Sequence, residues 1–268
     1  MNRIQMTFDG LKESGRSALV PYITAGDPKP WVTVPLMHGM VEAGADILEI
    51  GVPFSDPMAD GPTIQLACER ALQHNISLTN VLEMVTEFRK KDSKTPVVLM
   101  GYLNPVEVMG YVAFAQRAKA AGVDGLLTVD MPPEEAHELL AALEAENIAP
   151  IFLLSPTSSD DRIKYITNYA KGFLYYVSLK GVTGVKSLDV EGVSRKLESI
   201  RALTDMPVGV GFGIRDAETA AQVAAVADAV VVGSAVVQKI EQYKDKPDQI
   251  ISAVPLFIRE LRTAMDRK

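Results

Sequence analysis

LEIGVPFSDPMADGP, residues 48–62, is an apolar run that carries one carboxylate and then gives way to a proline-rich loop. Glu49 lies inside the apolar run, while Asp56 and Asp60 follow on the loop. A carboxylate at the C-terminal end of a buried strand, below a loop stiffened by three prolines, is poorly explained by packing. We therefore interpret Glu49 as an acid–base group with a shaped loop above it.

Short apolar runs alternate with amphipathic stretches along the whole chain, a pattern typical of parallel strands joined by crossover helices. Nearly continuous apolar runs are expected for strands that are buried on both faces. Eight such runs span residues 18–24, 46–52, 97–103, 125–130, 149–154, 173–178, 207–212 and 228–233. We predict an α/β fold: a single (β/α)8 TIM barrel over residues 1–268, with an N-terminal extra helix and short inserted helices. An open doubly wound sheet is the alternative, but it gives no reason to stop at eight strands.

Residues that favour the start or the end of a helix lie between these runs. Capping residues or prolines predict helix starts at Asp27-Pro28, Asn104-Pro105, Pro132-Pro133-Glu134-Glu135 and Ser158-Ser159-Asp160-Asp161. Glycines that suit a left-handed residue at a helix end stand at Gly44, Gly122 and Gly172.

Composition limits the class of protein. With 268 residues, 47% of them hydrophobic and 23% charged, the chain has the balance of a globular protein with a sizeable core. A net charge of −7 argues against nonspecific binding of nucleic acid. The single cysteine, Cys68, excludes an intrachain disulfide framework, fits a reducing compartment and is better explained by packing than by catalysis. The charged N-terminus has no apolar signal core, so we expect an unprocessed cytoplasmic protein.

Glycines cluster after the last two predicted strands, where the active face of a barrel is expected. Gly209, Gly211 and Gly213 follow one strand, and Gly233-Ser234 follows the next, at the start of a predicted helix. Backbone amides can approach an anion closely there because no Cβ blocks the path, which favours a phosphate site. Each glycine alone is better explained as a tight-turn residue, and the cluster lacks the context of a dinucleotide fingerprint.

These motifs together closely resemble the tryptophan synthase alpha subunit family. The resemblance runs from the first helix to the last and rests on Phe8, residues 21–28 (PYITAGDP), residues 49–62, residues 181–184 (GVTG) and residues 211–214 (GFGI). The resemblance implies a retro-aldol cleavage of indole-3-glycerol phosphate to indole and glyceraldehyde 3-phosphate.

The family's two catalytic carboxylates fall on Glu49 and Asp60. Glu49 matches the group that moves protons, and its Leu and Ile neighbours would desolvate it and raise its pKa towards the working pH. Asp60 matches the residue that accepts the indole N–H bond and stabilises the cationic intermediate. The alternative, purely structural roles are a strand-end salt bridge for Glu49 and a helix N-cap for Asp60.

The resemblance implies further contacts residue by residue. Substrate-binding positions are Tyr22, Ile64, Met100, Tyr102, Leu127, Tyr175, Thr183 and Phe212, with Tyr175 near Glu49 and Thr183 meeting Asp60 when its loop closes. Phosphate-binding positions are Gly184, Gly213, Ile214, Gly233 and Ser234. No metal site is implied.

Four positions depart from many family members. They have phenylalanine, leucine, tyrosine and arginine where this chain has Tyr22, Met100, Phe173 and Leu179. The first three changes keep an apolar or aromatic wall, although a buried Tyr22 hydroxyl needs a partner. Leu179 lacks an arginine contact that helps a loop close, unless Lys180 supplies it, so altered closure or affinity is expected.

The family also implies a partner, the beta subunit, in an assembly of two alpha and two beta chains. Pyridoxal phosphate would belong to that partner, and no cofactor is expected in this chain. Candidate interface residues are Pro53, Asp56, Pro57 and Pro132, for which ordinary loop stiffening is the alternative. Two other functions stay open: a different phosphate-binding barrel enzyme of amino-acid biosynthesis, and a noncatalytic regulatory barrel subunit.

Overall fold

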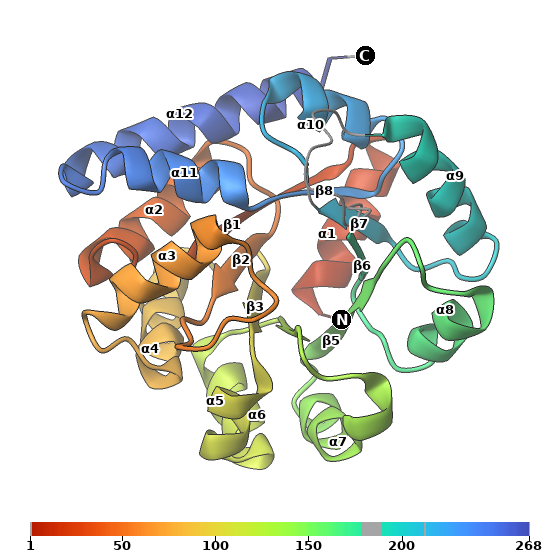
Figure 1. Ribbon diagram of the computed structural model, residues 1–268, viewed down its shortest axis with the longest axis horizontal. Coiled ribbons are helices and arrows are strands. Elements are labelled where there is room, and N and C mark those ends of the chain that lie inside the picture. Colours follow the sequence, from red (N-terminus) through yellow and green to blue (C-terminus); the bar gives the residue numbers. More distant parts are fainter. Residues whose placement is uncertain (1, 178–188, 212, 268) are drawn as a thin grey trace.

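Eight parallel strands close into a barrel in chain order (Figure 1). The computed structural model describes residues 2–177, 189–211 and 213–267. Each strand pairs with the next one along the chain, and the last pairs with the first, so the predicted barrel is confirmed. The strands are β1 (Ala18–Thr24), β2 (Leu48–Gly51), β3 (Val97–Gly101), β4 (Gly125–Thr128), β5 (Ala149–Leu154), β6 (Leu174–Val177), β7 (Val208–Gly211) and β8 (Ala229–Val232).

Apart from α1 (Arg3–Glu13), the helices surround the strands in an outer ring (Figure 1). The other helices found in the described ranges are α2 (Pro30–Glu42), α3 (Pro62–Leu72), α4 (Leu78–Arg89), α5 (Leu103–Met109), α6 (Tyr111–Ala121), the 3-10 turn η1 (Pro133–Glu135), α7 (His137–Ala145), α8 (Asp160–Thr167), α9 (Val190–Arg201), α10 (Ala217–Ala224), α11 (Ser234–Gln242) and α12 (Pro247–Met265). Within these ranges, none of the helices has the length and apolar character needed to cross a membrane.

Some of the predicted helix starts are confirmed and others are wrong. Ser159 caps α8, because its hydroxyl accepts a hydrogen bond from the Arg162 amide. Two other predicted starts are wrong. The Asp27 carboxylate binds Arg70 instead of capping α2, which begins at Pro30, and Asn104 lies inside α5 because that helix begins one residue earlier.

The predicted left-handed helix ends are confirmed at Gly44 and Gly122, whereas Gly172 is left-handed but lies four residues beyond Asn168, the C-cap of α8. Gly44, Gly122 and Gly172 have φ angles of 108°, 91° and 81°, in the left-handed region that a side chain with a Cβ rarely adopts. All three turns lead from an outer helix back towards the next strand.

The N-terminal extra helix closes one end of the barrel. Ile4, Phe8 and Leu11 of α1 are buried in one cluster with the inward side chains of the strands, including Val98 and Phe173. This packing fills the N-terminal end of the barrel interior with apolar side chains. These side chains block the N-terminal end, so we expect a ligand to enter from the opposite end, where the strands finish.

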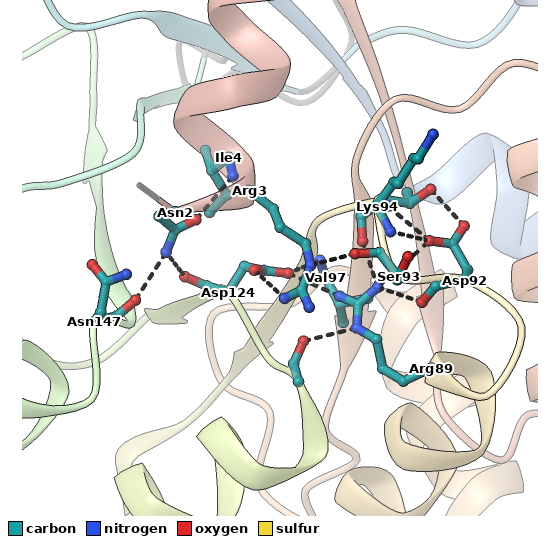
Figure 2. A network of polar contacts seen from close by, with 12 residues as sticks. Asn2, Arg3, Ile4, Arg89, Asp92, Ser93, Lys94, Val97, Asp124 and Asn147 are labelled. Carbon is teal, nitrogen blue, oxygen red and sulfur yellow. Dashed lines mark hydrogen bonds and ion pairs between the residues drawn. The ribbon is translucent and has the colours of Figure 1, made fainter.

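A polar network fastens α1 under the barrel (Figure 2). Asp124 accepts from Arg3 and Arg89, at 2.8 Å for each carboxylate oxygen, and from the Val97 amide at 2.9 Å. The Asn2 side chain donates to the carbonyl oxygens of Asp124 and Asn147 at 2.8 and 3.0 Å. Because this network lies at the closed end, it stabilises the fold and stands apart from the cavity described next.

Candidate active site

A cavity of about 210 Å³ opens at the C-terminal end of the barrel. Residues from β1, β2 and β3 and from the loops after β2, β7 and β8 meet there. Ten of the predicted site residues border it: Tyr22, Glu49, Asp60, Ile64, Met100, Tyr175, Gly213, Ile214, Gly233 and Ser234. The barrel thus brings together side chains that are up to 212 positions apart in the sequence, from residue 22 to residue 234.

Glu49 has an unusual environment for a carboxyl group. It is 1% exposed, and among the described residues neither of its side-chain oxygens has a hydrogen-bond partner. Burial, with a further contribution from the Asp60 carboxylate, raises the pKa of Glu49 to about 8. The direction agrees with the desolvation predicted from its apolar neighbours. The predicted alternative, a strand-end salt bridge, is wrong because no cation contacts this carboxyl group within the described ranges.

Asp60 is held by an aromatic hydroxyl. The Tyr102 hydroxyl donates to Asp60 Oδ2 at 2.9 Å and accepts from the Ala59 amide at 2.9 Å. Burial raises the pKa of Asp60, and the bond from Tyr102 opposes that shift. The N-cap position of α3 is Gly61, with no side-chain cap, so the alternative reading of Asp60 as a helix cap is wrong.

The cavity lining also includes four residues from the glycine-rich segments after β7 and β8. Gly213, with φ of 80°, and Ile214 follow β7, while Gly233 and Ser234 stand at the start of α11. A Cβ on Gly233 would have its closest contact with the Tyr22 Cβ, at 3.9 Å, an ordinary van der Waals distance. Protein packing therefore does not require glycine at this position, whereas the close approach of a ligand would.

Comparison with known proteins identifies the family. The family model "Tryptophan synthase alpha chain" matches residues 8–266. The chain belongs to the tryptophan synthase alpha chain family. Alpha chains of Nitrosococcus oceani and Thioalkalivibrio sulfidiphilus are 63% and 62% identical over 99% of this chain, covering 98% and 100% of the relatives. The crystal structure of the alpha subunit from Legionella pneumophila is 47% identical, with a TM-score of 0.93, and 99% of each chain is covered.

Family membership decides between the functions that the sequence left open. The chain is a carbon–carbon lyase of tryptophan biosynthesis, and the readings as another barrel enzyme or as a noncatalytic subunit are not favoured. Alpha chains of this family carry no cofactor and assemble with beta subunits, which hold the pyridoxal phosphate, as α2β2 complexes.

Two predicted site residues that the structure describes, Tyr102 and Leu127, do not border the cavity. Leu127 is fully buried one layer deeper, in the cluster that contains α1, and Tyr102 instead directs its hydroxyl to Asp60. Thr183, Gly184 and Phe212 lie outside the described residues, as do Leu179 and Lys180. Of the other three departures from the family, Tyr22 and Met100 border the cavity, and Phe173 is buried against Phe8.

The predicted partner residues occupy two loops. Asp56 is exposed and accepts a hydrogen bond from the Ser55 hydroxyl, and Pro57 and Pro132 are partly exposed. Pro53 is buried, so it can support its loop but cannot offer a surface to a partner.

Sequence reasoning missed several wall residues: Ala59, Gly61, Val129, Leu153, Val177 and Val231. Ala59 and Gly61 flank Asp60, and the four aliphatic residues lie at or near the ends of β4, β5, β6 and β8. Their signal was available in the alternation of strand residues, because side chains two positions apart face the same side. Applying that alternation to every predicted strand would have found the four aliphatic residues, but not Ala59 and Gly61, which lie on the loop after β2.

The Tyr102 contact leads to a prediction. Tyr102→Phe removes the bond that holds Asp60, so kcat/KM for indole release should fall about three- to tenfold. Because that bond lowers the pKa of Asp60, its loss should also move the acid limb of the kcat/KM profile to higher pH. Adding Tyr102→Phe to Asp60→Asn should cause little further loss; an additive loss would mean that Tyr102 acts independently of Asp60.

Proposed function

We propose that this cavity binds indole-3-glycerol phosphate with the phosphate at the loops after β7 and β8, and that Glu49 carries out both proton transfers. The reaction is the cleavage of that substrate to indole and glyceraldehyde 3-phosphate. The observation that carries the assignment is a fully buried carboxyl group, without a hydrogen-bond partner among the described residues, inside the same cavity as a cradle of backbone amides.

Glu49 starts the reaction as an acid. With its pKa raised to about 8, it is mostly protonated near neutral pH and can donate a proton to indole C3. The resulting carboxylate then takes the proton from the hydroxyl on the carbon attached to C3. That carbon becomes the aldehyde as its bond to C3 breaks, and the bonding electrons return to the indole ring. Glu49 regains its proton and is ready for another turnover.

Asp60 stabilises the cation formed after C3 is protonated. Its carboxylate borders the same cavity as Glu49, where it can accept the indole N–H bond and offset the positive charge. The Tyr102 bond limits the rise of its pKa, which favours the charged form that this role requires. Ile64 and Met100 supply apolar surface for the ring, and Tyr175 contributes an aromatic wall.

The phosphate is bound mainly by main-chain groups. Gly213, Ile214, Gly233 and Ser234 line the cavity, and their amides, with the Ser234 hydroxyl, are the proposed donors to the phosphate. α11 begins at Ser234, so its first free amides and the positive end of its dipole favour an anion there. Gly184 and Thr183 would complete the phosphate site and the contact with Asp60 from the loop after β6.

The beta subunit is proposed to contact the loops after β2, β3 and β4. Asp56, Pro57 and Pro132 are the predicted contacts, and their loops follow β2 and β4. Met58 and Val108, on the loop after β2 and on α5, are 81% and 80% exposed. Apolar side chains that exposed are suited to burial against a partner, and so we add both to the interface.

Residues 1–268 are proposed to form one domain, supported by the closure of the barrel by β1 and β8 and by the packing of α12 on α2. A cytoplasmic location is proposed from the single cysteine and the role in amino-acid biosynthesis.

Indole release from indole-3-glycerol phosphate, with and without added beta subunit, tests this function. The natural chain should release indole, and Asp60→Asn should lower kcat by about a hundredfold or more through loss of charge stabilisation. Asp205→Asn, which changes an aspartate outside the cavity lining, serves as the control. Absence of turnover by the natural chain with a competent beta subunit would refute the proposal.

A further inference from the structure

Apolar side chains fill the barrel interior on the N-terminal side of Glu49. Ile4 and Phe173 belong to this filling and are 0% and 1% exposed. Val98, in the same cluster, pairs with Glu49 in the register of β2 and β3. On this side of the cavity, the inward positions of the described strands hold only glycine, alanine, valine, leucine, isoleucine and phenylalanine. None of these side chains can form a hydrogen bond with the carboxyl group.

The Phe173 ring reaches the layer of side chains next to Glu49. Phe173 is the inward residue that precedes Tyr175 on β6, and Tyr175 pairs with Gly209 on β7. A Cβ at Gly209 would lie 3.3 Å from both Cδ2 and Cε2 of Phe173. The ring therefore occupies the space that a side chain at position 209 would take, and it leaves no room there for water.

Ile4 fills a corresponding place from below. Gly125 lies in register with Glu49, two strands away, through their common neighbour Val98. A Cβ at Gly125 would lie 3.0 Å from Ile4 Cδ1 and 3.0 Å from Ile151 Cδ1. Helix α1 thus contributes an apolar group to the same layer as the Phe173 ring.

The tyrosine hydroxyl groups beside Glu49 lie on its other side, towards the C-terminal ends of the strands. The Tyr22 hydroxyl occupies the place of a Cβ at Gly51, one inward position beyond Glu49 on β2, and the Tyr175 hydroxyl occupies that of a Cβ at Gly211. Neither hydroxyl bonds to Glu49, because both carboxyl oxygens lack a hydrogen-bond partner among the described residues. Any new partner must therefore approach from the cavity side.

We propose that Phe173 and Ile4 are positioning residues for Glu49: they deny its carboxyl group a hydrogen-bond partner on the N-terminal side, so that it faces the substrate site before substrate binds. This inference rests on the proposed function, in which Glu49 gives its proton to a group in the cavity. A buried polar group without a partner costs free energy. A donor placed beneath Glu49 would consequently draw the carboxyl group away from the cavity, and the apolar filling prevents this.

The titratable groups that face Glu49 come from three elements. They are Asp60 on the loop after β2, Tyr22 on β1 and Tyr175 on β6. Burial raises the pKa of both tyrosines, so they stay neutral, and no cationic side chain is among the described residues that line the cavity. A hydrogen bond from a new donor would favour the carboxylate, so it would lower the pKa of Glu49 from its value of about 8.

Phe173→Tyr tests the inference, because it adds a hydroxyl group to the ring that lies beneath Glu49. Infrared titration of the protonated carboxyl band, with the Glu49→Gln chain as the blank, measures the pKa of Glu49 without substrate. That pKa should lie about 0.5 to 1 pH unit lower in the variant, the effect of one hydrogen bond. Since this bond must break before the proton reaches indole C3, kcat for indole release should fall about three- to tenfold while KM changes less than about twofold.

Val98→Thr provides a second probe, because it places a hydroxyl group on the residue that pairs with Glu49 and keeps the shape of the side chain. It should lower the pKa of Glu49 in the same direction. Two control variants should leave that pKa unchanged: Phe173→Leu, which keeps the position apolar, and Phe114→Tyr, which adds the same hydroxyl to a fully buried ring on the outer helix α6.

An unchanged pKa of Glu49 in both Phe173→Tyr and Val98→Thr would overturn the inference. An equal fall in either control variant would overturn it too, because the effect would then come from disturbed packing. The infrared measurement needs no turnover, so failure of the natural chain to release indole would refute the proposed function as a separate outcome.

Discussion

Glu49→Gln is expected to lower kcat for indole release by about 10²- to 10⁴-fold, the range for loss of a general acid–base group. The substitution keeps the size of the side chain but can neither give up nor regain a proton. Substrate binding should persist, because the proposed phosphate and indole contacts are made by other residues. Steady-state indole release with saturating beta subunit measures the effect, and Glu198→Gln, exposed on α9, is the control. A variant within about tenfold of the natural chain would remove Glu49 from its proposed role.

The pH dependence of the natural chain follows from the same group. Glu49 must begin protonated to act on indole C3, and its pKa is raised to about 8. kcat/KM reports groups in the free enzyme, so it should fall as the pH rises above about 8. A limb that instead rises through this range would show that the ionised form starts the reaction.

The pH dependence of folding stability gives a second, independent measure of the pKa of Glu49. A carboxyl group whose pKa is higher in the folded state than the ordinary 4.5 stabilises the folded state only while it is protonated. That contribution is complete below pH 4.5 and declines as the pH rises towards about 8, with a limiting slope of about 1.4 kcal/mol per pH unit. Glu49→Gln should lack this slope. The quantity to compare is the difference in free energy of unfolding between the natural chain and Glu49→Gln as a function of pH. The absolute free energy of unfolding also shifts in the variant, because the glutamine amide is left without a partner.

The strands could be predicted from the sequence because burial on both faces gives them continuous apolar runs. All eight predicted runs contain a strand, and 18–24 and 149–154 match β1 and β5 at both ends. At the described ends that do not match, the predicted runs extend one or two residues beyond the strands. At some of these ends the surplus includes an aspartate that accepts a backbone hydrogen bond. Asp46 precedes β2 and accepts from the Leu19 amide, and Asp130 follows β4 and accepts from the Leu103 amide.

The sequence predicted many of the residues that line the site, but not which residues form hydrogen bonds or ion pairs with one another. The glycines and carboxylates at the strand ends predicted where the cavity lies. The family resemblance predicted most of the residues that line it. The partners of Tyr102 and Asp27 could not be read from local sequence, because each lies more than 40 positions away, at Asp60 and Arg70. Short-range rules assigned Asp27 to a nearby helix cap, whereas the fold offered it a guanidinium from another helix.

The Asp27–Arg70 ion pair links the helices that begin at both ends of the cavity. Arg70 donates from Nε and Nη2 to the two Asp27 oxygens at 2.6 and 2.9 Å, and it also approaches Glu241 at 3.3 Å. The Asp27 side chain is 0% exposed and that of Arg70 is 15% exposed. Arg70 lies near the end of α3, whose start follows Asp60, and Glu241 lies on α11, whose start is Ser234.

Arg70→Met is therefore expected to lower the free energy of unfolding by about 3–5 kcal/mol, because it leaves the Asp27 carboxylate buried without a counter-ion. Urea unfolding measures the loss. Lys171→Met, which breaks an exposed pair with Glu144, should cost no more than about 1 kcal/mol and serves as the control. Adding Asp27→Asn to Arg70→Met should recover part of the loss, because the unpaired charge disappears with it. A loss below about 1 kcal/mol in Arg70→Met would show that water reaches Asp27 and compensates for the missing arginine.

The same pair should also affect substrate binding, for a geometric reason. α3 and α11 pack against each other, and Arg70 connects both to the loop after β1 through Asp27 and Glu241. If this connection fixes the spacing between Asp60 and the amides at Ser234, Arg70→Met should raise KM for indole-3-glycerol phosphate more than it lowers kcat, because Glu49 sits on β2 and is not attached to either helix. Equal effects on the two constants at a temperature where the variant is fully folded would mean that the pair supports the fold without setting the length of the cavity.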